Sequence, residues 1–248
     1  MRRQLLLLLV AIQFLTRLPV PAGRDLPADA LAESARFFPL VGAIVGVGAI
    51  GIDLLVGSRA GRHVSVVLIL LYFVAVTGGL HEDGLADAAD GFGGGWTKDR
   101  VLAIMRDSNI GSFGALALGF SLLARFVFLT GMSAASFHGV LLAGQVLNRW
   151  ATLPLMHWLP SARSDDGQGA RVARKTSTTS LVIGTVFAVI IASAACGVTA
   201  LLMIAVAGGV AALTGAYYRR RIGGITGDCL GATCQLTEAA VYLAGVVS

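Results

Sequence analysis

Three aspartates in a glycine- and alanine-rich stretch are the residues of this sequence best suited to chemistry. Asp83, Asp87 and Asp90 are spaced i, i+4 and i+7 within Gly79–Gly91, so on a helix they fall on one face. Stacked carboxylates repel one another, and a cation that takes oxygen ligands, Mg²⁺ or Mn²⁺, removes that repulsion. Glu82 points about 100° away and is the weaker candidate. No lysine interleaves with these acids, as it does on ordinary solvated faces, so the pattern predicts a metal site.

A second acidic group follows the three arginines at 219–221, near the end of the chain. If this segment is helical, Asp228 and Gln235 share a face, and Glu238 lies one turn beyond Gln235. Asp228 follows a glycine-rich entry and also fits an ordinary helix cap. Glu238 lies inside an apolar run, where an ionisable side chain is a functional candidate by default. We therefore expect a second metal site here, or a site that positions a nucleophile.

Basic and polar side chains supply candidate phosphate contacts. Arg149 lies roughly 15 Å from the nearer end of its apolar stretch, which is too deep for a loop charge; a structural ion pair is the alternative. Arg106 and Ser108 stand with glycines before an expected helix start, a pattern typical of a phosphate cradle. Arg125 is expected to snorkel toward the outer end of its span. His81 lies opposite the aspartates and is expected to pack or cap a helix.

The composition indicates a membrane protein. Of the 248 residues 56% are hydrophobic and only 13% are charged, and the mean hydropathy is +0.78. So much apolar surface excludes a disordered chain, and so few charges argue against a soluble domain. The three cysteines are too few for a disulfide framework. We predict an all-α, polytopic integral membrane helical bundle, with residues 1–248 forming a single domain.

About six to seven membrane spans fit this length. The N-terminal segment is expected to form a short helix that half-enters the membrane or lies at its interface. Its apolar core is short for a span, and no clear cleavage site follows it. The predicted spans cover 36–57, 64–80, 110–131, 137–159, the two halves of 181–218, and a short final helix at 232–247.

Positive charges predict the orientation of these spans. They concentrate in four loops that are each separated by two spans and so lie on one side: 22–35, 82–109, 160–180 and 219–231. The positive-inside rule places these loops in the cytoplasm. We therefore expect a multi-pass protein of the bacterial cytoplasmic (inner) membrane with its acidic motifs facing the cytoplasm. The net charge of +5 is then an orientation signal, and no nucleic-acid partner is expected.

Four stretches together resemble a known family. Gly79–Gly91 resembles the signature of the cobalamin 5′-phosphate synthase (adenosylcobinamide-GDP ribazoletransferase) family. Three weaker motifs agree with it, and the matches run from residue 14 to residue 238. They are Phe14–Pro21, Met105–Ser108 with Gly111–Gly114, and Gly227–Ala232 with Gln235 and Glu238.

The resemblance implies a Mg²⁺-dependent enzyme of nucleotide-loop assembly in the lipid bilayer. It would join α-ribazole 5′-phosphate, or α-ribazole, to adenosylcobinamide-GDP and release GMP and adenosylcobalamin 5′-phosphate. On this reading Mg²⁺ bound by Asp83, Asp87 and Asp90 clamps the diphosphate, and Asp228 or Glu238 positions or deprotonates the attacking hydroxyl. The substrates would be held by Arg17, Arg106, Ser108, Arg149 and Gln235. A homo-oligomer is left open.

Two other readings compete with this one. Spaced aspartates also bind diphosphates in CDP-alcohol phosphotransferases and membrane prenyltransferases. The former expect Asp-Gly-x-x-Ala-Arg, whereas Ala86 is followed here by Asp87. The second reading is an ion-coupled transporter, which expects acids near the membrane midplane in related repeats. The main acids are instead expected at the cytoplasmic end of a span, which favours an enzyme.

Overall fold

The computed structural model describes residues 2–21, 30–163 and 176–248. These described residues form helices joined by short connections, with one isolated bridge between Ser161 and Ile225 and no strand. The predicted all-α class is therefore confirmed. The helices in chain order are α1 (Arg2–Leu15), α2 (Ala30–Ser34), η1 (Ala35–Phe37), α3 (Phe38–Ala60), α4 (Arg62–Thr77), α5 (Leu80–Gly94), α6 (Lys98–Ile104), α7 (Ser112–Gly131), α8 (Ala134–Trp150), α9 (Thr152–Trp158), α11 (Thr178–Cys196), η2 (Gly197–Thr199), α12 (Ala200–Ile222) and α13 (Gly227–Val247).

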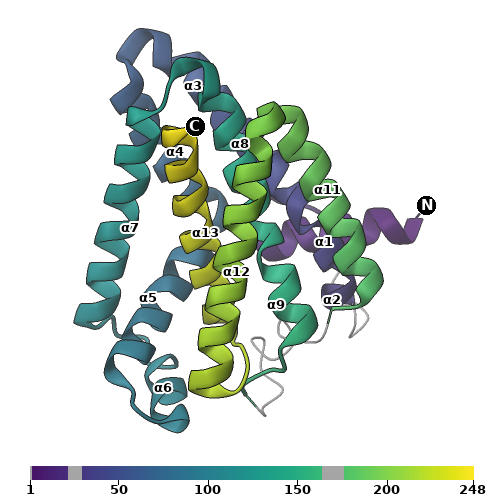
Figure 1. Ribbon diagram of the computed structural model, residues 1–248, viewed down its shortest axis with the longest axis vertical. Coiled ribbons are helices and arrows are strands. Elements are labelled where there is room, and N and C mark those ends of the chain that lie inside the picture. The colour runs from purple at the N-terminus through teal and green to yellow at the C-terminus, as the bar shows by residue number, and fades with distance from the viewer. Residues whose placement is uncertain (1, 22–29, 164–175) are drawn as a thin grey trace.

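The C-terminal helix α13 is the centre of the bundle (Figure 1, yellow). It packs against α5, α7, α8 and α12, and 67% of its most apolar stretch is buried. Small residues permit this close packing. Where α13 crosses α5, a Cβ on Gly84 would lie 3.1 Å from the Cα of Gly231, and a Cβ on Gly231 would lie 3.1 Å from the Cα of Gly84. This crossing places the two acidic motifs side by side.

Two consecutive glycines interrupt the helix between α4 and α5. Gly78 and Gly79 both have left-handed backbone angles, with φ of 67° and 71°, which other residues rarely adopt. The two helices consequently meet at an angle of 87°. The span predicted at 64–80 therefore ends at Thr77, and the segment 82–109, predicted as a loop, contains α5 and α6. The loop predicted at 219–231 is likewise shorter in the structure, where only four residues separate α12 from α13.

Candidate membrane spans can be counted from the lengths and composition of the described helices. By length and composition four stretches of the described chain could cross a membrane, or five if the bent pair α4–α5 counts as one. One of them, Thr178–Ile222, contains both α11 and α12, which Figure 1 shows reversing direction at η2. The other differences are of length: α4 has 16 residues, and the stretch 137–159 is divided into α8 with 17 and α9 with 7. The class of membrane helical bundle holds, and six to seven spans stays a prediction.

The N-terminal helix α1 differs from the other long helices. It has 14 residues, too few to span a bilayer, and Figure 1 shows it lying across the direction of the bundle. Its apolar residues Leu7, Ala11 and Leu15 are buried in the same core cluster as Phe38 of α3. This placement is consistent with the predicted short interfacial helix.

The glycine contact between α5 and α13 yields a first prediction. Gly84→Ala should lower the free energy of unfolding by about 1–3 kcal/mol, because the added methyl group overpacks the crossing. Thermal unfolding in detergent measures this loss. The matched control is Gly51→Ala on α3, where a Cβ meets no atom within 4 Å and alanine is the better helix former. Equal melting temperatures for the two variants would contradict the packing argument.

Candidate active site

The three aspartates of α5 share one face, as predicted, but their surroundings differ. Asp83 is exposed, Asp87 is half-buried and Asp90 is buried. The Asp90 carboxylate accepts hydrogen bonds from the backbone N–H groups of Gly111 (2.7 Å) and Gly114 (2.9 Å). Because Gly111 has no side chain to cap α7, Asp90 caps that helix from α5.

This difference bears on the predicted metal ligands. No group of three or more His, Cys, Asp or Glu side chains in the described residues is arranged to hold a metal ion. The carboxylates of Asp83 and Asp87 have no hydrogen-bond or salt-bridge partner among the described residues, whereas both oxygens of Asp90 already accept amide hydrogens. Ligation by Asp90 therefore stays a prediction.

The second acidic motif meets the first one. Asp228 lies at the start of α13, where Thr226 caps the helix and donates a hydrogen bond to the Asp228 carboxylate at 3.1 Å. Asp83, Asp90 and Asp228 all lie close to Asp87. The sequence predicted two acidic sites, and the α5–α13 crossing makes them one.

Among the described residues, Arg163 is the cation that pairs with this acidic cluster. Its Nη2 lies 2.9 Å from Asp228 Oδ2. Backbone pairing holds the segment before it, since Ala162 N donates to Ile225 O and Ile225 N donates to Pro160 O. Sequence reasoning treated Arg163 only as a loop charge that orients the protein. Its position in a charged loop gave no signal of the contact, which depends on a segment more than 60 residues away.

Two cavities border the acidic cluster. The small cavity has a volume of about 240 Å³ and the large cavity about 780 Å³. Asp83 lines both of them. The polar and charged residues around the small cavity also include His81, Arg149, Thr152, Arg163 and Asp228. Those around the large cavity also include Gln13, Thr16, Arg17, Thr77, Asp87 and Ser108.

Three residues that line the small cavity each have a buried nitrogen without a hydrogen-bond partner in the described part of the chain. These nitrogens are His81 Nε2, Arg149 Nε and Arg163 Nε. Buried polar atoms are rarely left unpaired, so this cavity has unused capacity for an anionic or hydroxylated ligand. His81 is buried, which agrees with the packing role predicted for it, but its unpaired nitrogen gives it a polar role as well.

A buried ion cluster lies behind the cavities. Arg125 of α7 is 1% exposed, and its Nη1 lies 3.4 Å from Oε1 of both Glu82 and Glu238. Gln235 donates to Glu82 at 3.0 Å, and Asn148 donates to Glu238 at 2.9 Å. The prediction that Arg125 snorkels is wrong, because two carboxylates from other helices pair with it inside the bundle.

Arg149 joins the ion cluster to the small cavity. Its Nη1 donates to the side-chain oxygens of Gln145 (2.9 Å) and Asn148 (3.0 Å). It has no carboxylate partner within salt-bridge distance among the described residues. Arg125 and Arg149 together balance the charge of the two buried glutamates, and Asn148 links Arg149 to Glu238. The structure places Glu238 and Gln235 in this cluster, and neither lines a cavity.

The remaining predicted phosphate contacts lie at the protein surface. Arg17 is exposed and lines the large cavity, and its backbone N–H donates to Val76 O at 2.7 Å. Arg106 and Ser108 are both exposed, but only Ser108 lines the large cavity. Asn109 donates to Asp107 through its backbone and its side chain, and these hydrogen bonds hold the pKa of the Asp107 carboxyl below its ordinary value.

Known proteins resemble this chain over nearly its whole length. Three relatives are each named adenosylcobinamide-GDP ribazoletransferase. The protein of Shewanella frigidimarina is 37% identical over 97% of this chain and 94% of its own length. The Chlorobaculum tepidum protein is 41% identical over 95% and 93%, and the Azorhizobium caulinodans protein is 42% identical over 96% and 93%.

No solved structure matches the chain. The family model described as cobalamin-5-phosphate synthase matches residues 7–246. The chain therefore belongs to the cobalamin-5-phosphate synthase family.

Proposed function

We propose that this protein is an adenosylcobinamide-GDP ribazoletransferase of cobalamin synthesis. The family match and the names of the relatives support this activity. The structural observation that carries it is the position of Asp83, which lies on the wall shared by two cavities. A transferase that joins two phosphate-bearing substrates needs such a meeting point, with negative oxygens held on one side and a nucleophile on the other.

The proposed reaction moves one phosphoryl group. The 3′-hydroxyl oxygen of α-ribazole 5′-phosphate, or of α-ribazole, forms a bond to the phosphorus that carries cobinamide. The bond from that phosphorus to the bridging oxygen of the diphosphate breaks, and GMP leaves with the electron pair. The hydroxyl proton passes to a carboxylate and then to water. The products are adenosylcobalamin 5′-phosphate, or adenosylcobalamin, and GMP.

Asp83 and Asp87 fit a Mg²⁺ site that is completed by substrate. Mg²⁺ in phosphoryl-transfer sites is commonly bound by one or two carboxylates together with phosphate oxygens and water, and these two aspartates have no hydrogen-bond or salt-bridge partner among the described residues. The nearby carboxylate of Asp228 adds a further acidic group to this site, and Arg163 is the described cation that pairs with Asp228. Bound Mg²⁺ supplies charge neutralisation for the diphosphate.

The two cavities fit two different substrates. We assign the large cavity to the diphosphate of the donor, where Arg17 and Ser108 contact phosphate oxygens. We assign the small cavity to the ribose and phosphate of the acceptor, where Arg149 and Arg163 have unpaired buried nitrogens. Asp228 lines the small cavity and Glu238 does not. Asp228 is therefore our candidate for positioning and deprotonating the hydroxyl.

We further propose that the active site faces the cytoplasm from the bacterial inner membrane. Figure 1 places α6, the end of α9 and the end of α12 at one end of the bundle. Two of these segments are basic, α6 with Lys98 and Arg100 and the end of α12 with Arg219–Arg221, as the positive-inside rule expects for the cytoplasmic side. The single domain over 1–248 and a homo-oligomer stay predictions.

The activity itself is the first test. Purified membranes incubated with adenosylcobinamide-GDP and α-ribazole 5′-phosphate should release GMP, together with a corrinoid phosphate, in equal amounts. Chelation of divalent cations should stop the release, and added Mg²⁺ should restore it, because the diphosphate charge needs neutralisation. Chromatography of both products measures the reaction. Folded protein that forms neither product would contradict the proposed substrates.

The metal ligands can be tested by a matched pair of aspartates. Asp87→Ala should lower kcat/KM by about 10²–10³-fold, on the scale of losing one electrostatic contact to the transition state. Asp99→Ala should change it little, because Asp99 is exposed on α6 and lines neither cavity. GMP release is measured for both at saturating Mg²⁺. Wild-type turnover by Asp87→Ala would remove it from the metal site.

The roles of Glu238 and Asp228 separate in a third test. Arg125→Met should lower the free energy of unfolding by about 3–5 kcal/mol, because it leaves two buried carboxylates without their cation. Arg125→Met combined with Glu238→Gln should recover part of that loss. Thermal unfolding in detergent measures both. Glu238→Gln alone should retain turnover that Asp228→Asn loses, and the reverse pattern of turnover would make Glu238 the base.

A further inference from the structure

An apolar groove of the described chain lies away from both cavities of the active site. It has a volume of about 750 Å³, within the range of about 300–1,000 Å³ common for small-molecule pockets. Its walls are α8, α9, α11 and α12, and none of its lining residues borders the small or the large cavity. The groove is therefore a separate site on the surface of the bundle.

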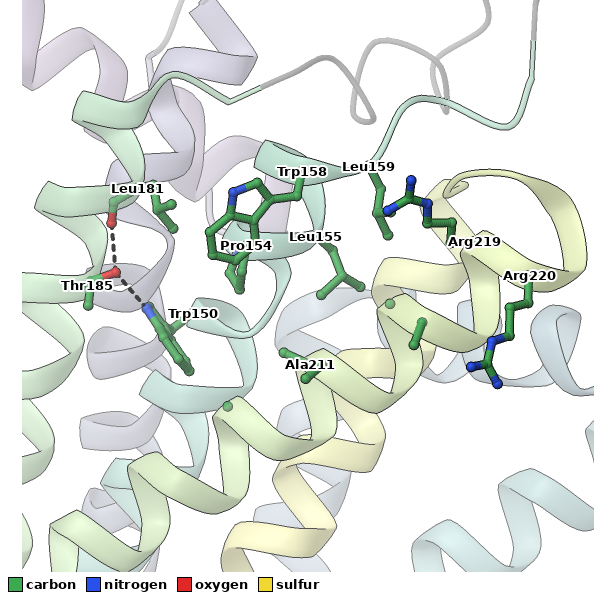
Figure 2. Close-up of a pocket in the computed structure, with 14 residues that line it drawn as sticks. Trp150, Pro154, Leu155, Trp158, Leu159, Leu181, Thr185, Ala211, Arg219 and Arg220 are labelled. Carbon is green, nitrogen blue, oxygen red and sulfur yellow. Dashed lines mark hydrogen bonds between the residues drawn. The ribbon is translucent and has the colours of Figure 1, made fainter.

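The walls of the groove suit a hydrocarbon chain. Figure 2 shows Trp150, Pro154 and Leu155 along it, with Ala211 of α12 opposite. The floor on α12 is hollow because small residues repeat there, at Gly208, Ala211, Ala212, Gly215 and Ala216. A Cβ on Gly208 or Gly215 would still have no neighbour closer than 3.6 Å, so the close approach of another helix does not explain these glycines.

The two ends of the groove differ in charge. Arg219 and Arg220 stand at one end, both exposed, and neither forms an ion pair or hydrogen bond with a described residue through its side chain. The next residue, Arg221, is different, because its guanidinium donates to the backbone oxygens of Gly95 and Phe92. Arg221 thus fastens α12 to the bundle, and its two neighbours remain available to a ligand.

Two tryptophans line the groove at different depths. Trp158 is 70% exposed and lines the groove in Figure 2, in the half nearer the arginines than Trp150 is. Trp150 lies deeper, and its indole N–H donates to Thr185 at 3.0 Å. Exposed tryptophans are typical of the headgroup region, and basic residues between membrane helices are typical contacts for anionic headgroups.

We propose that this groove binds an anionic phospholipid, with one acyl chain between α9 and α12 and its phosphate at Arg219 and Arg220. The charge complementarity at one end and the apolar walls along the rest fit an amphipathic anion. A free phosphate has no apolar part that could contact the apolar walls of the groove. The bound lipid fills the gap between the α11–α12 hairpin and α9 and stabilises the bundle.

The test uses the full chain purified in detergent micelles. Phosphatidylglycerol should raise the melting temperature more than phosphatidylcholine with the same acyl chains, and native mass spectrometry should detect it bound. Arg219→Gln with Arg220→Gln should weaken the apparent affinity about fivefold per arginine and remove the preference for the anionic lipid. The matched control is Arg59→Gln, an exposed arginine on α3, which should keep that preference.

A second variant tests the acyl chain independently of charge. Gly215→Leu places a side chain in the groove and should lower the amount of lipid that co-purifies, while glycerol phosphate, which lacks acyl chains, should shift no melting temperature. The proposal is overturned if the two lipids stabilise the wild-type protein equally, or if the double arginine variant keeps the preference. It is also overturned if adenosylcobinamide-GDP displaces the lipid, because the groove would then belong to the substrate.

Discussion

Arg125 lies fully buried between Glu82 of α5 and Glu238 of α13, and the geometry of the site depends on this arrangement. A guanidinium without counter-charges at that depth would be strongly disfavoured, and so would either glutamate alone. The three charges therefore hold α5, α7 and α13 in one relative position. Gln235 and Asn148 each donate a hydrogen bond to one of the two carboxylates, and Asn148 adds α8 to the same cluster.

The acidic site one turn away has the opposite character. In the ion cluster two arginines balance two glutamates, whereas Asp83, Asp87 and Asp228 have Arg163 as their adjacent cation. The cluster is buried and its two glutamates are matched by two arginines, whereas the site borders two cavities and has more carboxylates than cations among the described residues. A buried group of charges that balance one another can hold helices together. A group of carboxylates without enough cations is stabilised when a metal ion binds. The same few turns of α5 contribute to both, since Glu82 and Asp83 point in different directions.

Glycine determines how closely these elements approach. Gly78 and Gly79 turn α5 away from α4, so that its acids run across the bundle instead of continuing along a span. Gly84 and Gly231 then let α5 touch α13 at the backbone. Asp90 adds a third restraint, because its carboxylate caps the start of α7 from α5. Within fifteen residues, the acids of α5 thus pair with a buried arginine, line two cavities and cap a neighbouring helix.

Much of this protein can be predicted from local features of its sequence. Composition predicts the all-α membrane bundle, helical periodicity places Asp83 and Asp87 on one face, and the motifs identify the family. Tertiary structure decided the rest: the pairing of Arg125 with Glu82 and Glu238, the recruitment of Arg163 to Asp228, and the capping role of Asp90. Periodicity relates residues three or four positions apart, whereas Arg125 and Glu238 are separated by 113 positions. Only the crossing of helices, set by small residues and buried charge, brings such side chains together.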